Sequence, residues 1–196
     1  KISKKPVLYD KAMRFLEKRV KNVKNGGREL IWILEHPTTF TGGIRFNNDE
    51  ILDKSILVKR TNRGGKITLH NPGQKIVYFV INLNKRKKNI RNLVRQIENI
   101  IIEFLKIYGI TSSSDRKNIG IWVKDKKIAA IGIRVSRWIA YHGFSINIDN
   151  DLSQYKKIIP CGLDNKKITS IKNQGNNFNN IEKNLKKVIL KNMSKI

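Results

Sequence analysis

The stretch IGIWVKDKKIAAIGIRVSRWIAYHGFSINI, residues 119–148, decides the fold class of this chain. It contains three runs rich in β-branched and aromatic residues, at 119–123, 128–135 and 141–148. Only short connections separate these runs, and Lys124-Asp125-Lys126 is typical of a hairpin turn. Strands joined by such short connections pair antiparallel. The stretch therefore predicts three successive strands of a mainly antiparallel sheet.

The segments on either side of this stretch alternate between helical and extended patterns. Apolar residues recur at helical spacing in 6–23, 89–108 and 180–191. Further β-rich runs lie at 30–34, 56–58, 67–69 and 76–83, and Asp151 is placed to cap a short helix at 151–155. This order predicts one α+β (mixed α/β) domain, residues 1–196, in which helices flank a mixed, mainly antiparallel sheet. It excludes a doubly wound nucleotide-binding fold.

The composition limits the class of protein. The chain has 196 residues, of which 39% are hydrophobic, so it is long and apolar enough to bury a core of its own. No apolar stretch approaches the roughly 20 residues of a membrane-spanning helix, and no signal-peptide pattern opens the sequence. Cys161 is the single cysteine, which excludes an intramolecular disulfide and favours a reducing compartment. We therefore expect a cytoplasmic protein that does not associate with membranes.

The net charge is strongly positive. Lys and Arg number 41 against 15 Asp and Glu, which gives +26. Such an excess is typical of proteins that bind a polyanion or another acidic partner. However, the excess is spread over the chain with many Ile and Asn, and Lys, Ile and Asn share A/T-rich codons, so compositional drift is an alternative explanation. The sequence contains no RNA-recognition signature, zinc finger or basic leucine zipper.

Gly64-Gly65-Lys66 resembles part of a phosphate-binding loop. That motif requires Gly five positions before the Gly-Lys pair and Ser or Thr directly after it, whereas this chain has Arg60 and Ile67 there. The two glycines therefore mark either an ordinary turn or a place where the backbone must approach another group closely.

The histidines do not form a metal motif. His36, His70 and His142 are far apart in the sequence and lack the close pairs that mark zinc sites. His70 and His142 each adjoin unusual backbone, in His70-Asn71-Pro72-Gly73 and His142-Gly143. They either line a pocket or are structural histidines with satisfied hydrogen bonds.

Cys161 lies in a Pro160-Cys161-Gly162 loop. A lone cysteine usually behaves as a small apolar side chain, but a stiff turn could also present a nucleophilic thiol. Such a thiol needs a neighbouring cation or base. The residues alone leave Lys126, Lys127, His70 and His142 as candidates.

Taken together, several motifs resemble the lipoyl(octanoyl) transferase family over nearly the whole chain. They are Glu35-His36-Pro37, Thr41-Gly42, Arg63-Gly64-Gly65-Lys66-Ile67-Thr68-Leu69-His70, Pro72-Gly73-Gln74, Lys127-Ile128-Ala129-Ala130-Ile131-Gly132-Ile133-Arg134, Arg137-Trp138, His142-Gly143 with Asn147, Asp151-Leu152, Pro160-Cys161-Gly162 and Ile168-Thr169-Ser170. The resemblance implies a fold like that of biotin and lipoate protein ligases.

The resemblance also implies roles for particular residues. Cys161 corresponds to the nucleophile that carries the acyl thioester, and Lys127 corresponds to its partner. The acyl-substrate pocket corresponds to Arg63, Gly64, Gly65, Lys66, Ile67, Thr68, Leu69, His70, Ala130, Ile131, Gly132, His142, Gly143, Phe144 and Ser145. Asn71 and Ser145 depart from the family pattern of Gly and Ala. We expect Asn71 to be a mild change because Asn tolerates a positive φ.

The activity implied is transfer of an octanoyl group from octanoyl-acyl carrier protein to a lysine of a lipoyl domain. The acceptors implied are the lipoyl domains of 2-oxoacid dehydrogenase complexes and the glycine-cleavage H protein. No cofactor, metal or nucleic acid is expected. Two alternatives stay open at this point, an ATP-dependent lipoate–protein ligase and a basic nucleic-acid-binding module.

Overall fold

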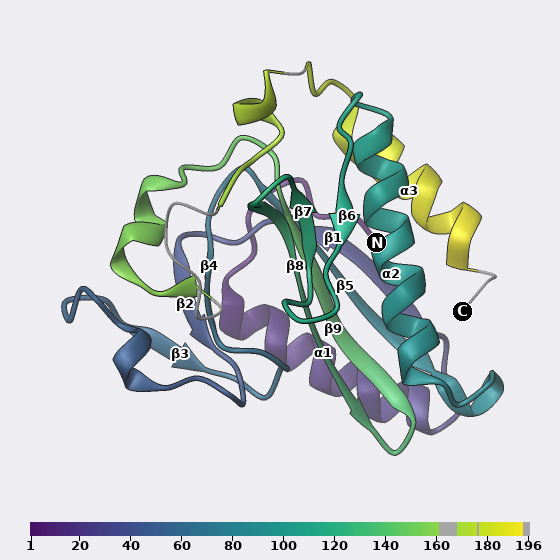
Figure 1. Ribbon diagram of the computed structural model, residues 1–196. Coiled ribbons are helices and arrows are strands. Elements are labelled where there is room, and N and C mark those ends of the chain that lie inside the picture. Colours follow the sequence, from purple (N-terminus) through teal and green to yellow (C-terminus); the bar gives the residue numbers. More distant parts are fainter. Residues whose placement is uncertain (161–167, 176, 194–196) are drawn as a thin grey trace.

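The fold is built around a six-stranded antiparallel sheet. The computed structural model describes residues 1–160, 168–175 and 177–193. The strand order is β1-β5-β9-β8-β7-β6 (Figure 1). The bounds are β1 Leu30–Leu34, β5 Gln74–Asn82, β6 Ser113–Ser114, β7 Ile121–Val123, β8 Lys126–Ser136 and β9 Ile139–Asn147. The three successive strands predicted from residues 119–148 are therefore β7, β8 and β9, and they are neighbours in the sheet.

A second sheet of three strands lies beside the first. Its order is β3-β2-β4, with β2 parallel to β3 and antiparallel to β4. The bounds are β2 Thr39–Gly42, β3 Val58–Arg60 and β4 Ile67–His70. Strand β2 was not among the strands expected from the sequence. The strand expected at 56–58 begins later, since Leu57 is 82% exposed and only Val58 belongs to β3.

Helices cover both faces of the large sheet (Figure 1). Helix α1, Tyr9–Lys24, packs on one face against β5 and β9. Helices α2, Ile90–Lys106, and α3, Ile181–Asn192, lie side by side on the other face. Short 3-10 helices occupy η1 Asn48–Glu50, η2 Leu83–Lys85, η3 Ser153–Lys157 and η6 Lys172–Gln174. The helix predicted at 151–155 is thus the 3-10 helix η3.

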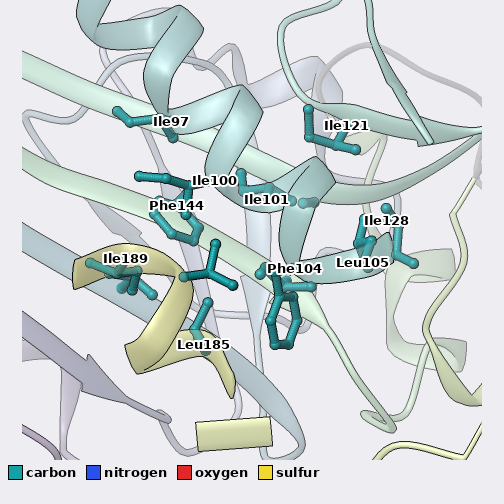
Figure 2. Packing of buried hydrophobic residues seen from close by; sticks show 14 of the residues in the cluster. Ile97, Ile100, Ile101, Phe104, Leu105, Ile121, Ile128, Phe144, Leu185 and Ile189 are labelled. Atoms are coloured by element: carbon teal, nitrogen blue, oxygen red, sulfur yellow. The ribbon is translucent and has the colours of Figure 1, made fainter. Parts of the chain in front are cut away.

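The start of α2 shows how the sequence sets a helix boundary. The Asn89 side-chain oxygen accepts a hydrogen bond from the Asn92 N–H at 2.9 Å and caps the first turn. The apolar stripe that follows is buried against the sheet, as Ile97, Ile101 and Phe104 show in Figure 2. The same cluster includes residues of α3 and of the sheet face beneath, so the largest core lies between the sheet and α2 with α3.

The predicted mixed fold, with a mainly antiparallel sheet flanked by helices, is confirmed. Among the described residues, no helix has the length and apolar character needed to cross a membrane.

Candidate active site

A cavity lies between β4 and the centre of the six-stranded sheet. The loop that precedes β4 approaches β8 closely here, since the Gly64 N–H donates to the Ile133 carbonyl oxygen at 3.2 Å. The cavity is lined by Arg63, Gly64, Gly65, Lys66, Thr68, His70, Ile76, Tyr78, Lys127, Ala130, Ile131, Gly132, His142, Gly143, Phe144 and Ser145. It therefore brings together most of the residues that the resemblance points to.

Two of those residues lie elsewhere. Successive side chains of a strand point to opposite faces. In β4, Thr68 and His70 line the cavity, whereas Ile67 and Leu69 are fully buried in a separate apolar cluster with Phe40. The structure thus places Ile67 and Leu69 behind the strand and not in the cavity.

The cavity also contains two residues that the sequence analysis missed. Ile76 and Tyr78 of β5 line it. Val77 and Phe79, which alternate with them along the strand, face the core under α2. The alternation of side chains along this strand predicts that Ile76 and Tyr78 share a face. The sequence alone does not show which face of the sheet holds the cavity.

A β-bulge brings Lys127 to the cavity. Trp122 pairs with Lys127 but Ile121 pairs with Ala129, which leaves Ile128 as an extra residue in β8. A bulge interrupts the alternation of side chains along a strand. As a result Lys127 and Ala130 both line the cavity, although they are three residues apart, and Ile128 and Ala129 both pack in the core.

A second irregularity brings His142 to the same face. Its backbone φ is 67°, in the left-handed region that residues other than Gly seldom adopt. Ala140 and Ile146 pack in the core, and plain alternation would place His142 with them. Instead its ring stacks on that of Tyr141 with centroids 4.9 Å apart, and its Nε2 lies 2.6 Å from Asn62 Oδ1. The left-handed backbone turns this histidine into the cavity.

Lys127 is a buried lysine whose backbone is fixed on both sides. It is 5% exposed, and its Nζ lies 5.4 Å from the centre of the Trp122 ring. Its carbonyl oxygen accepts a hydrogen bond from the Thr169 N–H at 2.9 Å, and Ile168 forms a parallel bridge with it. Cys161, the nucleophile predicted by resemblance, lies outside the described residues.

A hydrogen-bond network fixes the polar end of the cavity. Nδ1 of His70 lies 2.8 Å from Gln74 Oε1, and the Gln74 amide donates to Asn147 Oδ1 at 2.9 Å. The Asn147 amide in turn donates to the Thr169 carbonyl oxygen at 2.9 Å. The network links β4, β5 and β9 to the segment that holds Lys127, so it ties the orientation of His70 to the position of that segment.

The buried histidines are neutral at physiological pH. Burial lowers the pKa of His36 to about 4, partly offset by its hydrogen bond with the Val7 carbonyl. Burial lowers the pKa of His70 to about 3, and the nearby His36 is the second cause of this shift. Burial followed by the charge of Arg63 lowers the pKa of His142 to about 3. His70 and His142, the two histidines that line the cavity, are therefore uncharged near pH 7.

Arg63 shapes the loop before β4. It is 8% exposed, and its Nη2 donates to the Thr41 carbonyl and hydroxyl oxygens at 2.6 and 2.9 Å. Its Nη1 donates to the Gly64 carbonyl oxygen at 2.9 Å. These bonds hold the Arg63–Gly64 backbone against β2, which gives this wall of the cavity a fixed position.

The two departures from the family pattern have different surroundings. Asn71 does not have a positive φ, so the conformational tolerance that was expected to matter is not used. Its side chain instead donates to the Asp151 carbonyl oxygen at 2.8 Å and accepts from the Asn150 amide at 2.9 Å. Ser145 lies in the cavity wall, paired with Ala130 of β8. Among the described residues, no group of three His, Cys, Asp or Glu side chains is placed to hold a metal ion.

Comparison with known proteins identifies the family. The family profile "Lipoyl protein ligase A/B catalytic domain" matches residues 9–193. An octanoyltransferase of Ehrlichia ruminantium (strain Gardel) is 45% identical over 185 residues, which cover 91% of this chain and 89% of that protein. An octanoyltransferase of Wolbachia sp. subsp. Brugia malayi is 42% identical over 180 residues, 89% of this chain and 88% of that protein.

The chain belongs to the octanoyltransferase family. It is therefore an acyltransferase with octanoyltransferase activity in protein lipoylation, and the family and the enzyme class inferred from the motifs are confirmed.

Solved structures confirm the fold of this octanoyltransferase. A putative lipoate protein ligase from T. acidophilum with bound lipoic acid superposes with a TM-score of 0.81 at 13% identity, covering 98% of this chain and 84% of that one. A lipoate-protein ligase A bound with ATP gives 0.78 at 12% identity, covering 99% and 85%. At such low identity the likeness concerns the fold alone, which is the biotin/lipoate protein ligase-like fold that was expected.

Proposed function

We propose that this octanoyltransferase moves an octanoyl group from the thioester of an acyl carrier protein to a lysine of a lipoyl domain, through a thioester on Cys161 with Lys127 as its proton partner. The observation that carries the proposal is the placement of Lys127. It is a buried amine in the wall of a cavity that is otherwise formed mainly by apolar side chains and glycine backbone.

The residues on both sides of 161–167 support Cys161 as the nucleophile, because they lie near this cavity. On one side, the Ile159 N–H donates to the Glu50 carbonyl oxygen at 2.8 Å, and the Glu50 carboxylate pairs with Lys66 Nζ at 2.8 Å in the cavity wall. On the other side, Ile168 forms a β-bridge with Lys127. The described residues on either side of positions 161–167 therefore contact elements that hold the cavity.

In the first half-reaction, the Cys161 sulfur attacks the octanoyl carbonyl carbon. A carbon–sulfur bond to Cys161 forms, and the carbon–sulfur bond to the carrier breaks. Lys127 delivers the proton that it shares with the Cys161 thiol to the departing carrier thiolate. Backbone N–H groups at Cys161 and Gly162 are our candidates for stabilising the oxyanion.

In the second half-reaction, the neutral amine of the acceptor lysine attacks the octanoyl-Cys161 thioester. An amide bond forms, the bond to Cys161 breaks, and Lys127 takes a proton from the attacking nitrogen. Exchange of one thioester for another changes the free energy little, and conversion of a thioester to an amide lowers it. The sequence of steps therefore needs no ATP and no cofactor.

The cavity walls suit a medium-length acyl chain. Gly132 and Gly143 pair across β8 and β9, and Ile76 and Ala130 add apolar surface beside them. Each methylene group transferred from water to such a surface contributes about 0.8 kcal/mol. A slot of fixed depth would thereby favour an eight-carbon chain over shorter ones.

The charge of the chain suits the proposed partners. Acyl carrier proteins and lipoyl domains, including those of 2-oxoacid dehydrogenase complexes and the glycine-cleavage H protein, are typically acidic. A chain with a net charge of +26 would attract them over long range and speed encounter. The reaction would proceed in the cytoplasm, where a nucleophilic thiol stays reduced.

The test is intact-protein mass after incubation with octanoyl-acyl carrier protein. We expect a hydroxylamine-labile octanoyl adduct on the wild-type chain, none on Cys161→Ser, and slow formation on Lys127→Ala. An arm with free octanoate and ATP examines the ligase reaction. An adduct that persists on Cys161→Ser, or product formed only from octanoate and ATP, would overturn the proposal.

A further inference from the structure

The stem of Lys127 occupies the space that a side chain at position 120 would fill. A Cβ atom built on Gly120 would lie 2.3 Å from Cε and 3.1 Å from Nζ of Lys127. Real Cβ atoms essentially never lie within 3.0 Å of another atom, so any other residue at position 120 would displace Cε of the lysine. The φ of Gly120 is +144°, which also favours glycine. The glycine thus provides the room in which Lys127 lies.

Trp122 is a second close neighbour of the lysine. It is the cross-strand partner of Lys127, is 7% exposed, and its ring centre lies 5.4 Å from Nζ. An ammonium group within about 6 Å of an indole ring is attracted to the negative face of the ring. The ring is itself anchored, because its Nε1 donates to the Asn118 carbonyl oxygen at 3.0 Å.

The backbone of Lys127 has little freedom of its own. The bulge at Ile128, the pairing with Trp122 and the hydrogen bond from the Thr169 N–H hold it from two sides. What remains variable is the four-carbon stem, which is long and would otherwise sample many rotamers. Among the described residues, Gly120 leaves room for that stem and Trp122 lies beside its end.

We propose that Gly120 and Trp122 are positioning residues that together hold the Lys127 side chain so that Nζ enters the acyl cavity in one orientation. This inference rests on the proposed role of Lys127 in proton transfer. Neither residue belongs to the set that the family resemblance assigned to the site. Their effect acts through Lys127, so it must vanish when Lys127 is removed.

The first experiment compares Gly120→Ala with Gly26→Ala in the full chain. Gly26 also has a positive φ, +87°, but a Cβ there would meet nothing within 4 Å, so it reports the effect of a side chain at a positive φ without a steric clash. Single-turnover octanoyl transfer to Cys161 is measured against donor concentration. We expect Gly120→Ala to slow the maximal rate at least tenfold with little change in the half-saturating donor concentration, and Gly26→Ala to match the wild type.

The second experiment repeats Gly120→Ala in a Lys127→Ala background and measures alkylation of Cys161 by iodoacetamide against pH. Since Cys161 is the single cysteine, the mass of the protein reports on it directly. We expect Gly120→Ala to slow alkylation at pH 7 and move its pH midpoint upward in the wild type, and to change neither in the Lys127→Ala background. Equal slowing in both backgrounds would overturn the proposal and leave Gly120 a purely structural role.

A third pair of variants decides the matter if Gly120→Ala does not fold, because its Cβ would also lie 2.7 Å from the Ala129 carbonyl oxygen. Trp122→Leu removes the aromatic ring beside Nζ, and Trp122→Phe keeps one. We expect Trp122→Leu to slow transfer several-fold and Trp122→Phe to restore most of the rate. Equal rates for the two variants would contradict the proposal. If Lys127→Ala itself transfers octanoyl at the wild-type rate, the proposed function fails, and that result is distinct from the outcomes above.

Discussion

The two faces of the six-stranded sheet are built by the same strands but differ in how regularly the side chains alternate between them. Toward α2 and α3, side chains such as Phe79, Ile81 and Ile146 follow plain alternation into one apolar cluster. Toward the cavity, Lys127 and His142 arrive only through a bulge and a left-handed residue. An apolar core tolerates many arrangements of similar side chains. Plain alternation would turn Lys127 and His142 toward the core, so their presence in the cavity depends on departures from regular strand geometry.

The largest expected effect comes from disturbing the backbone where the cavity face is most crowded. A Cβ on Gly143 would lie 1.9 Å from the Val77 carbonyl oxygen, a backbone atom of the neighbouring strand. We expect Gly143→Ala to lower the free energy of unfolding by about 4 kcal/mol or more, because β5 and β9 cannot both keep their places. Urea titration or a thermal melt measures this loss.

The matched control for this variant is Gly132→Ala. Gly132 is the cross-strand partner of Gly143, but its nearest contact would be 3.2 Å, to the Gly64 carbonyl oxygen. Similar stability of the two variants would mean that the close approach of β5 and β9 at Gly143 is not what requires glycine.

The second prediction concerns the apolar face. Phe104 of α2 is fully buried in the core cluster, and its ring packs edge-on against Tyr108 with centroids 5.2 Å apart. We expect Phe104→Ala to cost about 3–5 kcal/mol of stability through the cavity it leaves. The folded variant should keep its kcat/KM, since Phe104 lies on the side of the sheet away from the site. Leu190→Ala, at a side chain that is 60% exposed, should change stability by less than about 0.5 kcal/mol.

The third prediction concerns how the stability of the fold depends on pH through its three buried histidines. Burial lowers the pKa of His36 to about 4 and of His70 and His142 to about 3. In the unfolded chain these groups take up protons near pH 6.5, whereas in the folded chain they stay neutral until pH 3–4. Protons therefore favour the unfolded state, and stability falls as the pH falls below about 6.5.

Between pH 6.5 and 5.5 this linkage amounts to about 1 kcal/mol for each histidine, or about 3 kcal/mol for the three. Urea unfolding across this range measures it. A His142→Asn variant should show a shallower dependence, because one proton-binding group is gone. An unchanged stability between the two pH values would mean that these histidines are not held neutral by burial.

The parts of the fold that the sequence predicted are those with strong periodicity. The helix expected at 89–108 is Ile90–Lys106, and the strands expected in 119–148 are β7, β8 and β9. Strand β2 was missed because Thr39–Gly42 is short and carries Thr and Gly, and its partners β3 and β4 are non-local in sequence. Pairing of distant strands is a tertiary effect that local propensity does not contain.

The residues of the candidate site were predicted from sequence motifs and not from the alternation of side chains along strands. The motifs pointed to the stretch from Arg63 to His70 as one unit, but strand alternation sends Ile67 and Leu69 to the far side. Conversely, Tyr78 lies in the cavity without belonging to any motif. The role of Gly120 was beyond reach for the same reason, since the room it leaves for Lys127 depends on how β7 and β8 approach each other.

The smallest effect that we predict comes from adding a methyl group at Gly132, on the cavity face of the sheet. A methyl group at Gly132 would lie 3.2 Å from the Gly64 carbonyl oxygen and 3.4 Å from Arg63 Cδ, which neighbours can accommodate by small shifts. We therefore expect Gly132→Ala to fold and to narrow the acyl slot. Each methylene that no longer fits costs about 0.8 kcal/mol, a roughly fourfold loss of kcat/KM.

The measurement is kcat/KM with octanoyl, hexanoyl and butanoyl carrier proteins, with Gly26→Ala as the control because a side chain there meets nothing within 4 Å. We expect Gly132→Ala to lose about fourfold to tenfold on octanoyl while butanoyl transfer is unchanged, because the short chain ends before the narrowed part. An equal loss on all three donors would place Gly132 beside the reacting carbonyl. The length preference would then have to come from another part of the wall, and the glycine pair of β8 and β9 would serve the close packing of backbones alone.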